Sequence, residues 1–133
     1  VVGSPAYLAA HGTPETPRDL TDHKGVVLRL PTSGGLYPWT FAKKDQELTV
    51  RIPPRGVFNS VPMMMQAALD GVGLASLPED VVADAIADRR LVRVLADWSP
   101  VRPGYHLYCP GRRQPSPAFS LVLEALRTYR SAS

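Results

Sequence analysis

The sequence predicts an α/β domain whose sheet is built with crossover connections. Helix signals and strand signals alternate along the 133 residues, an order typical of such sheets. Apolar residues make up 44% of the chain and charged residues 20%, a globular composition with enough apolar side chains for a core. The 14 prolines fall mostly at the boundaries between the predicted elements, where they punctuate the chain.

Two helical segments open the chain, each with capping signals. A short helix runs from Ser4, a favourable N-cap residue, to Gly12, which can adopt the left-handed conformation that ends a helix. A second helical turn begins at Thr16, with Asp19 placed as in a capping box, and closes at Gly25. Both helices are therefore predicted from their ends rather than from a long apolar pattern.

Three strand-like runs follow. Residues 26–30 are mostly apolar, as in a buried strand, and residues 31–35 are rich in turn formers. Residues 38–41 and 48–52 flank a polar turn at residues 43–47, and the second of them alternates apolar and polar positions. This pattern predicts an antiparallel hairpin with one wet face.

The second half of the chain continues the alternation. Ser60 is the expected cap of a helix over residues 62–70, and residues 72–77 read as a buried strand. A helix over residues 79–90 has acidic residues in its first turn and two arginines in its last, matching the helix dipole. Residues 91–95 are expected to form a strand at an edge of the sheet.

Two further elements are predicted near the end of the chain. Residues 105–109 read as a strand, and a helix with one apolar face begins at Ser116-Pro117.

Composition excludes several classes of protein. One cysteine cannot form an internal disulfide, which favours a reducing compartment, so we expect a cytoplasmic protein. No apolar run approaches the length of a membrane helix, and no signal peptide is visible, so we expect no membrane partner. The net charge of +3 is spread along the chain, which argues against direct DNA binding by these residues.

No pattern of catalytic or metal-binding residues is present. The three histidines, His11, His23 and His106, have no metal-ligand spacing, and Cys109 lacks a nucleophile signature. Gly71 and Gly73 precede a strand, whereas dinucleotide-binding folds need their glycines after a strand. The end of a helix followed by close packing of the backbone explains these two glycines. We therefore expect no catalytic residue, no metal and no cofactor.

Two loops carry the residues best suited to bind a ligand. Thr32 and Ser33 follow the strand over residues 26–30, and Asn59 and Ser60 lead into a helix N-terminus. In open α/β sheets, ligands bind beyond the carboxyl ends of strands. Hydroxyls, an amide and free backbone N–H groups suit a carboxylate or another polar anion. The competing interpretation is that these are only turn and cap residues.

The order of several short motifs resembles the effector-binding region of LysR-type bacterial transcription regulators. The motifs are VGSPAYLAAHG at residues 2–12, Pro14, Asp19-Leu20, PWTF at 38–41, Asn59, AALDGVGLASLP at 67–78, LVRVL at 91–95, YCPGRR at 108–113 and Ser116-Pro117. The resemblance covers nearly the whole chain.

The resemblance implies a fold similar to type 2 periplasmic solute-binding proteins, with a mixed sheet flanked by helices. Residues 4–95 would form most of the second lobe, and residues 105–130 would return to the first lobe as a strand and a helix. The DNA-binding helix-turn-helix domain and the opening part of the first lobe would be absent, so half of the cleft would be missing. Dimers that assemble into tetramers are implied for the parent protein.

By the same resemblance, an effector binds between the lobes. On this chain the ligand-binding residues would be Thr32, Ser33 and Gly34 in one loop and Asn59 and Ser60 in the other. Arg29 and Tyr37 are weaker candidates for the same site. The expected function is sensing of a small, anionic metabolite that controls transcription.

Two other functions stay open on the sequence. One is a solute-binding lobe of a transport system, which would have the same fold and an export signal. The other is an enzyme on the same two-lobed fold, which would need a catalytic cysteine or threonine context that the sequence lacks.

Overall fold

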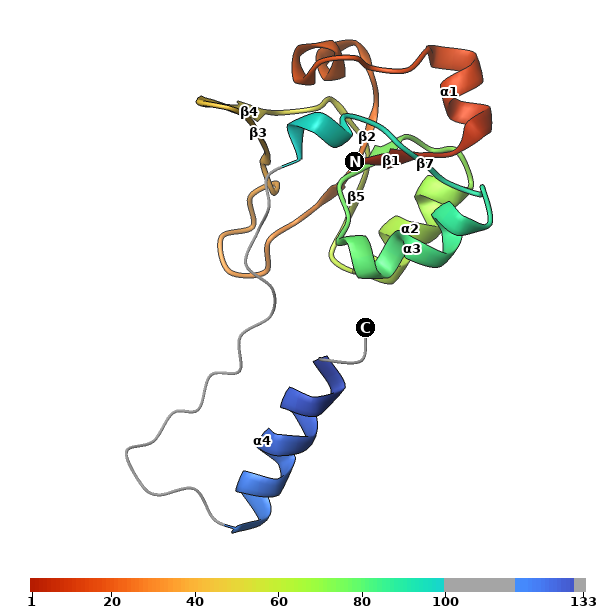
Figure 1. The fold of residues 1–133 in the computed structure, drawn as a ribbon. Coiled ribbons are helices and arrows are strands. Elements are labelled where there is room, and N and C mark those ends of the chain that lie inside the picture. Colours follow the sequence, from red (N-terminus) through yellow and green to blue (C-terminus); the bar gives the residue numbers. More distant parts are fainter. Residues whose placement is uncertain (100–116, 131–133) are drawn as a thin grey trace. The chain divides into compact units, whose positions relative to one another are not determined.

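The computed structural model describes residues 1–99 and 117–130. The chain divides into two units, Val1–Arg102 and Pro103–Ser133. The first unit contains a five-stranded mixed sheet with helices packed on it (Figure 1), which confirms the predicted α/β class. The described part of the second unit is the helix α4 (Pro117–Arg130), which confirms the predicted C-terminal helix.

The sheet has the strand order β5-β2-β6-β1-β7. Its strands are β1 (Val2–Gly3), β2 (Gly25–Leu28), β5 (Pro54–Phe58), β6 (Leu74–Ala75) and β7 (Val92–Arg93). Strand β2 runs parallel to both β5 and β6, whereas β1 pairs antiparallel with β6 and β7. Strands β5 and β7 are therefore the two edges of the sheet within the described residues, and the edge position predicted for the strand at residues 91–95 is confirmed.

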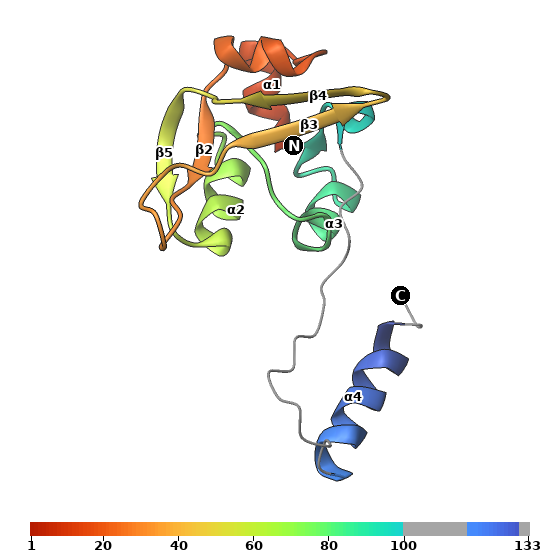
Figure 2. The same ribbon diagram turned by 90° about the vertical axis from the view of Figure 1, so that its left-hand side faces the viewer.

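One face of the sheet is covered by α1 (Pro5–His11), the 3-10 helix η1 (Pro17–Asp22), and the hairpin of β3 (Trp39–Lys43) and β4 (Gln46–Val50). Figure 2 shows this hairpin and α1 on the same side of β2. Val27 points to this face and belongs to a core that includes Tyr7, Leu20, Trp39 and Phe41.

The other face carries α2 (Val61–Leu69) and α3 (Glu79–Ala87). Val26 points here because successive side chains of a strand alternate between faces. It packs in a second core with Met64, Ala68, Val82 and other apolar residues. Both faces of β2 are thus buried, which explains why its sequence is apolar at consecutive positions.

The predicted caps of the first two helices are confirmed. The Ser4 side chain accepts a hydrogen bond from the Tyr7 N–H at 3.2 Å, and Gly12 ends α1 with φ of +83°. The Asp19 carboxylate accepts the N–H groups of Thr16 at 2.8 Å and Glu15 at 3.0 Å. These two bonds, with that of Thr16 the larger effect, lower the pKa of Asp19 from its ordinary 3.8.

The predicted hairpin is confirmed, with a tighter turn than expected. Strands β3 and β4 pair from Trp39 with Val50 to Lys43 with Gln46. Only two residues connect them, and the first, Lys44, has a positive φ of 53°. Positive φ values are typical of two-residue hairpin turns, because they match the twist of the strands.

The second helical segment is shorter than predicted and is a 3-10 helix. It ends at Asp22, and Gly25 does not close it but is the first residue of β2. The Gly25 N–H donates to the Pro53 carbonyl at 2.9 Å, and a Cβ at this position would lie 2.4 Å from Ile52 Cγ2. Gly25 is required by close packing at the start of a strand rather than by a turn.

Three predicted strands are also shorter than expected. The run at residues 26–30 leaves the sheet after Leu28 because the Leu30 N–H bonds to Gly35 within the following loop. The run at residues 72–77 pairs only at Leu74–Ala75, and that at residues 91–95 only at Val92–Arg93. The strand at residues 91–95 stops before Leu95, because the φ of +56° at Leu95 is incompatible with a strand.

The helix predicted over residues 79–90 ends at Ala87, so its two arginines do not lie in the last turn. Arg89 has φ of +58°, and the N–H groups of Arg90 and Leu91 both bond to the Ala85 carbonyl. This left-handed residue turns the chain away from the helix axis.

Two strands were not predicted. Strand β1 contains only two residues, and β5 begins with Pro54, Arg55 and Gly56, which have no strand pattern. Strand β5 forms because its backbone pairs with β2 along four positions. The strand predicted at residues 105–109 lies outside the described residues. No helix in the described part of the chain is long and apolar enough to cross a membrane.

Candidate functional site

The structure brings the two predicted loops to one edge of the sheet. Strands β2 and β5 are parallel neighbours in register, with Leu28 opposite Phe58. Beyond this pair, the Arg29 N–H donates to the Phe58 carbonyl at 2.7 Å. Figure 2 shows the loop after β2 and the segment from β5 into α2 at the same end of both strands. Residues 32–34 and residues 59–60 therefore share the edge where the carboxyl ends of these strands lie.

The loop after β2 has a fixed shape. The Leu30 N–H donates to the Gly35 carbonyl and the Gly34 N–H donates to the Leu30 carbonyl, both at 2.9 Å. Gly34 has φ of +67°, a conformation that glycine adopts at little cost. Arg29 Nη1 donates to the Gly34 carbonyl at 3.0 Å. Arg29, one of the weaker candidates, thus braces the loop from within.

The other half of the edge is the N-terminus of α2. Ser60 occupies the N-cap position as predicted, but its side chain makes no capping hydrogen bond. The first N–H groups of a helix have no partner within it, and they form the positive end of the helix dipole. Pro62 has no N–H, so Val61 and Met63 carry the first-turn donors near Ser60. This end of α2 is suited to a negatively charged or polar group.

The predicted side chains are little used by the fold. Among the residues that the structure describes, no hydrogen bond engages the side chains of Thr32, Asn59 or Ser60. The Ser33 hydroxyl accepts one long bond, from the Gly35 N–H at 3.4 Å. Thr32, Ser33 and Asn59 are exposed, and Ser60 is half-buried.

A hollow of about 280 Å³ lies beside this loop. It is on the sheet face that Val27 shares with the hairpin, and its lining is Val27, Gly35, Leu36, Tyr37, Arg51 and Ile52. The Tyr37 N–H donates to the Leu28 carbonyl at 2.8 Å, which holds that residue close to the end of β2. Tyr37, the second weaker candidate, therefore lines a cavity next to the predicted loop.

Arg51 is the residue of this region that sequence reasoning missed. A signal was available in the distribution of charge. Arg29 is the one charged residue between Lys24 and Lys43, and two arginines, at 51 and 55, are the charged residues between Glu47 and Asp70. Arg29 thus follows β2 at its carboxyl end, whereas Arg51 and Arg55 lie near the start of β5.

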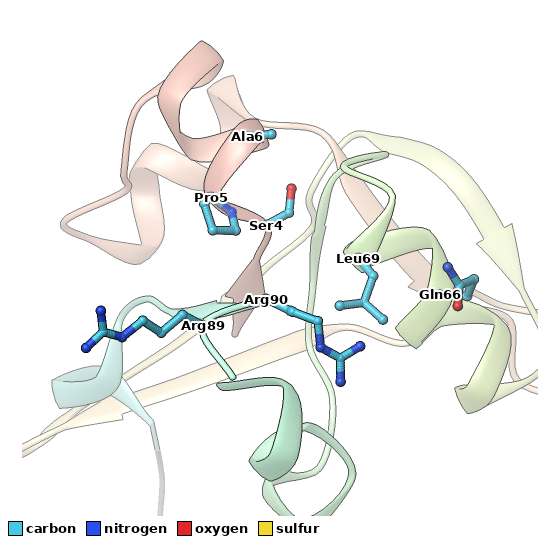
Figure 3. Close-up of a pocket in the computed structure, with 7 residues that line it drawn as sticks. All are labelled: Ser4, Pro5, Ala6, Gln66, Leu69, Arg89 and Arg90. Atoms are coloured by element: carbon cyan, nitrogen blue, oxygen red, sulfur yellow. The ribbon is translucent and has the colours of Figure 1, made fainter. Parts of the chain in front are cut away.

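A larger cavity, of about 440 Å³, lies elsewhere (Figure 3). Its lining is Ser4, Pro5, Ala6, Gln66, Leu69, Arg89 and Arg90. It contacts the C-terminal part of α2, whereas Ser60 lies at the N-terminus of that helix. Arg90 pairs with Asp88 at 3.3 Å, and the Gln66 amide donates to Asp70 at 2.9 Å. Figure 3 shows the side chains of Arg89 and Arg90 directed to different sides, so they do not converge on one group.

The described histidines have structural partners. His23 is buried, with its Nδ1 3.3 Å from the Tyr7 hydroxyl. His11 stacks on the Tyr7 ring with 4.3 Å between centroids. In residues 1–99 and 117–130, no three His, Cys, Asp or Glu side chains are grouped to hold a metal ion. His106 and Cys109 lie outside these residues.

The family model described as "LysR substrate binding domain" matches residues 1–131. A putative transcriptional regulator of Pseudomonas aeruginosa is 52% identical over 130 residues, which cover 98% of this chain and 42% of that protein. The HTH-type transcriptional regulator PgrR of Escherichia coli is 41% identical over 132 residues, covering 99% of this chain and 44% of that protein. The chain spans less than half the length of these relatives.

Solved structures of the same kind resemble this fold. The regulatory domain of AphB from Vibrio vulnificus has a TM-score of 0.64 and 30% identity, over 73% of this chain and 48% of that chain. CrgA, a LysR-type transcriptional regulator from Neisseria meningitidis, has a TM-score of 0.65 and 28% identity, over 76% of this chain and 33% of that chain. These matches confirm the family and the fold class that the sequence motifs indicated. The chain belongs to the LysR substrate-binding domain family, the effector-binding domains of LysR-type transcriptional regulators, which is not a family of enzymes.

Proposed function

We propose that this chain senses a small anionic metabolite at the edge formed by the loop after β2 and the N-terminus of α2. The observation that carries the proposal is the group of polar side chains at this edge that the fold does not use. The side chains of Thr32, Asn59 and Ser60 have no hydrogen-bond partner within the described residues, although they are held on well-braced backbone. Residues placed in this way are available to a ligand.

The sign of the ligand's charge follows from two features. The free N–H groups at the start of α2 favour a negative group. At the edge itself Arg29 follows β2, and residues 25–42 and 48–69 contain no acidic residue. A carboxylate or a similar anion is therefore favoured over a cation or a neutral sugar.

In the longer regulator, the ligand acts by stabilising one arrangement of two lobes. A ligand that contacts both lobes binds their closed arrangement more tightly and shifts the population toward it. DNA is contacted by a helix-turn-helix domain outside this chain, and the name of PgrR as an HTH-type regulator supports that part of the proposal. The regulator would work in the cytoplasm as a homo-oligomer, and its sensing requires no cofactor.

The relatives favour this function over a transport role. The curated relatives described above are transcriptional regulators. A solute-binding lobe would have the same fold, so fold alone does not separate the two functions.

A thermal-shift screen tests the proposal. Small carboxylic acids and their neutral amides are added to the purified 133-residue chain, and acids that raise the melting temperature are then titrated. We expect Asn59→Ala and Ser33→Ala to weaken the binding of such an acid by about ten- to a hundredfold, the loss of one hydrogen bond to a charged group. Arg89→Gln, in the larger cavity, is the matched control and should leave binding unchanged. Equal affinities for all four proteins would refute the proposed site.

A further inference from the structure

We propose that the hollow beside the loop is a subsite in which Arg51 anchors the carboxylate of a small aliphatic acid. The inference rests on the proposed function and deepens it, because it assigns a residue and a chemical class to the effector. Nothing in the sequence motifs pointed to Arg51.

Arg51 is held in place by its neighbours while its guanidinium stays available. It directly follows β4 and precedes Ile52, which is 5% exposed in the core. The Pro53 carbonyl, one residue further, accepts the Gly25 N–H at 2.9 Å. The backbone of Arg51 is thus fixed against β2. Its side chain is exposed and has no ion pair or hydrogen bond among the described residues.

A comparison with Arg29 shows why Arg51 is the anchor. Arg29 follows β2 and Arg51 lines the hollow beside the same loop, but Arg29 Nη1 already donates to the Gly34 carbonyl. Replacing that bond by a ligand would cost the loop its brace. Arg51 can offer a planar, two-pronged donor to a carboxylate without breaking any contact of the fold.

The remaining walls of the hollow are mainly apolar. Val27 and Ile52 are almost fully buried, at 3% and 5% exposure. Leu36 stands at the rim with 43% of its surface exposed, which is high for a large aliphatic residue. An apolar pocket with one or two polar groups is typical of sites for small organic ligands. An aliphatic ligand body would cover Leu36 and contact the side chains beneath it.

The volume limits the size of the ligand. About 280 Å³ is near the lower end of the roughly 300–1,000 Å³ range of small-molecule pockets. A short branched carboxylic acid fits this space, and a nucleotide does not. Inorganic phosphate would pair with Arg51 but would leave the aliphatic walls uncovered, and a neutral amide would cover the walls without a charge for Arg51.

The test is an NMR titration of the 133-residue chain with 4-methylpentanoate, 4-methylpentanamide and inorganic phosphate. We expect the acid to shift the amide signals of Gly35, Leu36, Tyr37 and Arg51 in a saturable way, and to bind at least about tenfold more tightly than the other two probes. Arg51→Gln should weaken binding of the acid by about tenfold, and Leu36→Ser should weaken its binding as well. Arg55→Gln, on the neighbouring strand, is the matched control.

The outcomes separate this inference from the proposed function. Equal binding of acid and amide, unchanged affinity of Arg51→Gln, or the absence of saturable shifts at these residues would overturn the subsite. If the subsite responds while Asn59→Ala binds the acid normally, the subsite stands and the proposed role of Asn59 fails. If Asn59→Ala and Ser33→Ala weaken the binding of an acid that the Arg51→Gln variant binds with normal affinity, the proposed subsite alone fails.

Discussion

The two ends of the parallel strands use their polar residues differently. At the amino end, Ser4 caps α1, and Asp19 accepts two backbone N–H groups just before β2. At the carboxyl end, Ser60 occupies a cap position without a capping bond, and Asn59 has no partner within the described residues. The larger cavity is lined by Ser4, by residues in the C-terminal part of α2 and by two arginines beyond the end of α3, whereas the candidate ligand site is at the carboxyl end.

Under the proposed function, cavity size alone does not identify the ligand site. Around the 440 Å³ cavity, Ser4, Gln66 and Arg90 are already engaged by the protein, and the remaining polar side chain, Arg89, is directed away from Arg90 (Figure 3). Around the 280 Å³ hollow, the Arg51 side chain has no hydrogen bond or ion pair among the described residues. A polar group that the fold leaves unused is the stronger sign of a ligand.

The largest effect is expected from Gly73 at the amino end. A Cβ at this position would lie 2.5 Å from the Lys24 carbonyl oxygen, a backbone atom that cannot move aside cheaply. Gly73→Ala should therefore lower the free energy of unfolding by about 2–3 kcal/mol, as overpacking does. Chemical denaturation measures this. Gly35→Ala at the carboxyl end, where the nearest atom is the Ser33 hydroxyl at 3.4 Å, should change stability by less than about 0.5 kcal/mol; equal losses would contradict the assigned roles.

The two cap serines form a matched pair with a smaller effect. Ser4→Ala removes a buried capping bond and should cost about 1–2 kcal/mol of stability. Ser60→Ala removes no capping bond and should cost less than about 0.5 kcal/mol. Titration with an acid should give the opposite ranking, because only Ser60→Ala should weaken binding of the acid. A Ser60→Ala variant as unstable as Ser4→Ala would show that Ser60 is a structural cap.

A third variant tests the fixed shape of the loop. Gly34→Ala places a side chain on a residue with φ of +67°, where open space surrounds the Cβ. The cost is the backbone conformation alone, about 1 kcal/mol. We expect a small loss of stability with a clear loss of acid binding, because a shift of the loop backbone would move the carbonyl of residue 34 away from Arg29. Unchanged affinity would mean that the loop shape does not matter for the ligand.

The smallest effect concerns the pH dependence of stability. The pKa of Asp19 is lower in the folded state, mainly because the Thr16 N–H bonds to its carboxylate. Its contribution is therefore complete above the ordinary value of 3.8 and is lost as the pH falls through the lower folded pKa. Asp19→Asn should flatten this acid limb of the stability profile, measured by denaturation between about pH 2 and pH 5. An identical limb in both proteins would contradict the assigned role of the carboxylate.

The elements with local signals were predicted well from the sequence. Ser4 and Gly12 identified α1, and the alternating pattern of residues 48–52 identified the hairpin. The short strands were not predicted. Strand β5, for example, contains Pro54 and Gly56 and forms because it pairs with β2. Gly25 was assigned to a turn because glycine serves both turns and close packing, and only the position of Ile52 distinguishes them.

The candidate site was predicted in part. Residues 32–34 and 59–60 were expected together because loops at the carboxyl ends of parallel strands share an edge. Arg51 was missed because it is separated from the loop by the whole hairpin, and only the folded chain places it beside Gly35.

The central claim is that ligand binds at the carboxyl end of the parallel strands. Hydrogen–deuterium exchange of the 133-residue chain, with and without an acid selected by the thermal-shift screen, tests it most directly. We predict slower exchange at residues 29–37 and 59–63 and no change at residues 4–6, 66–69 and 89–90. Protection of the second group without the first would contradict the claim.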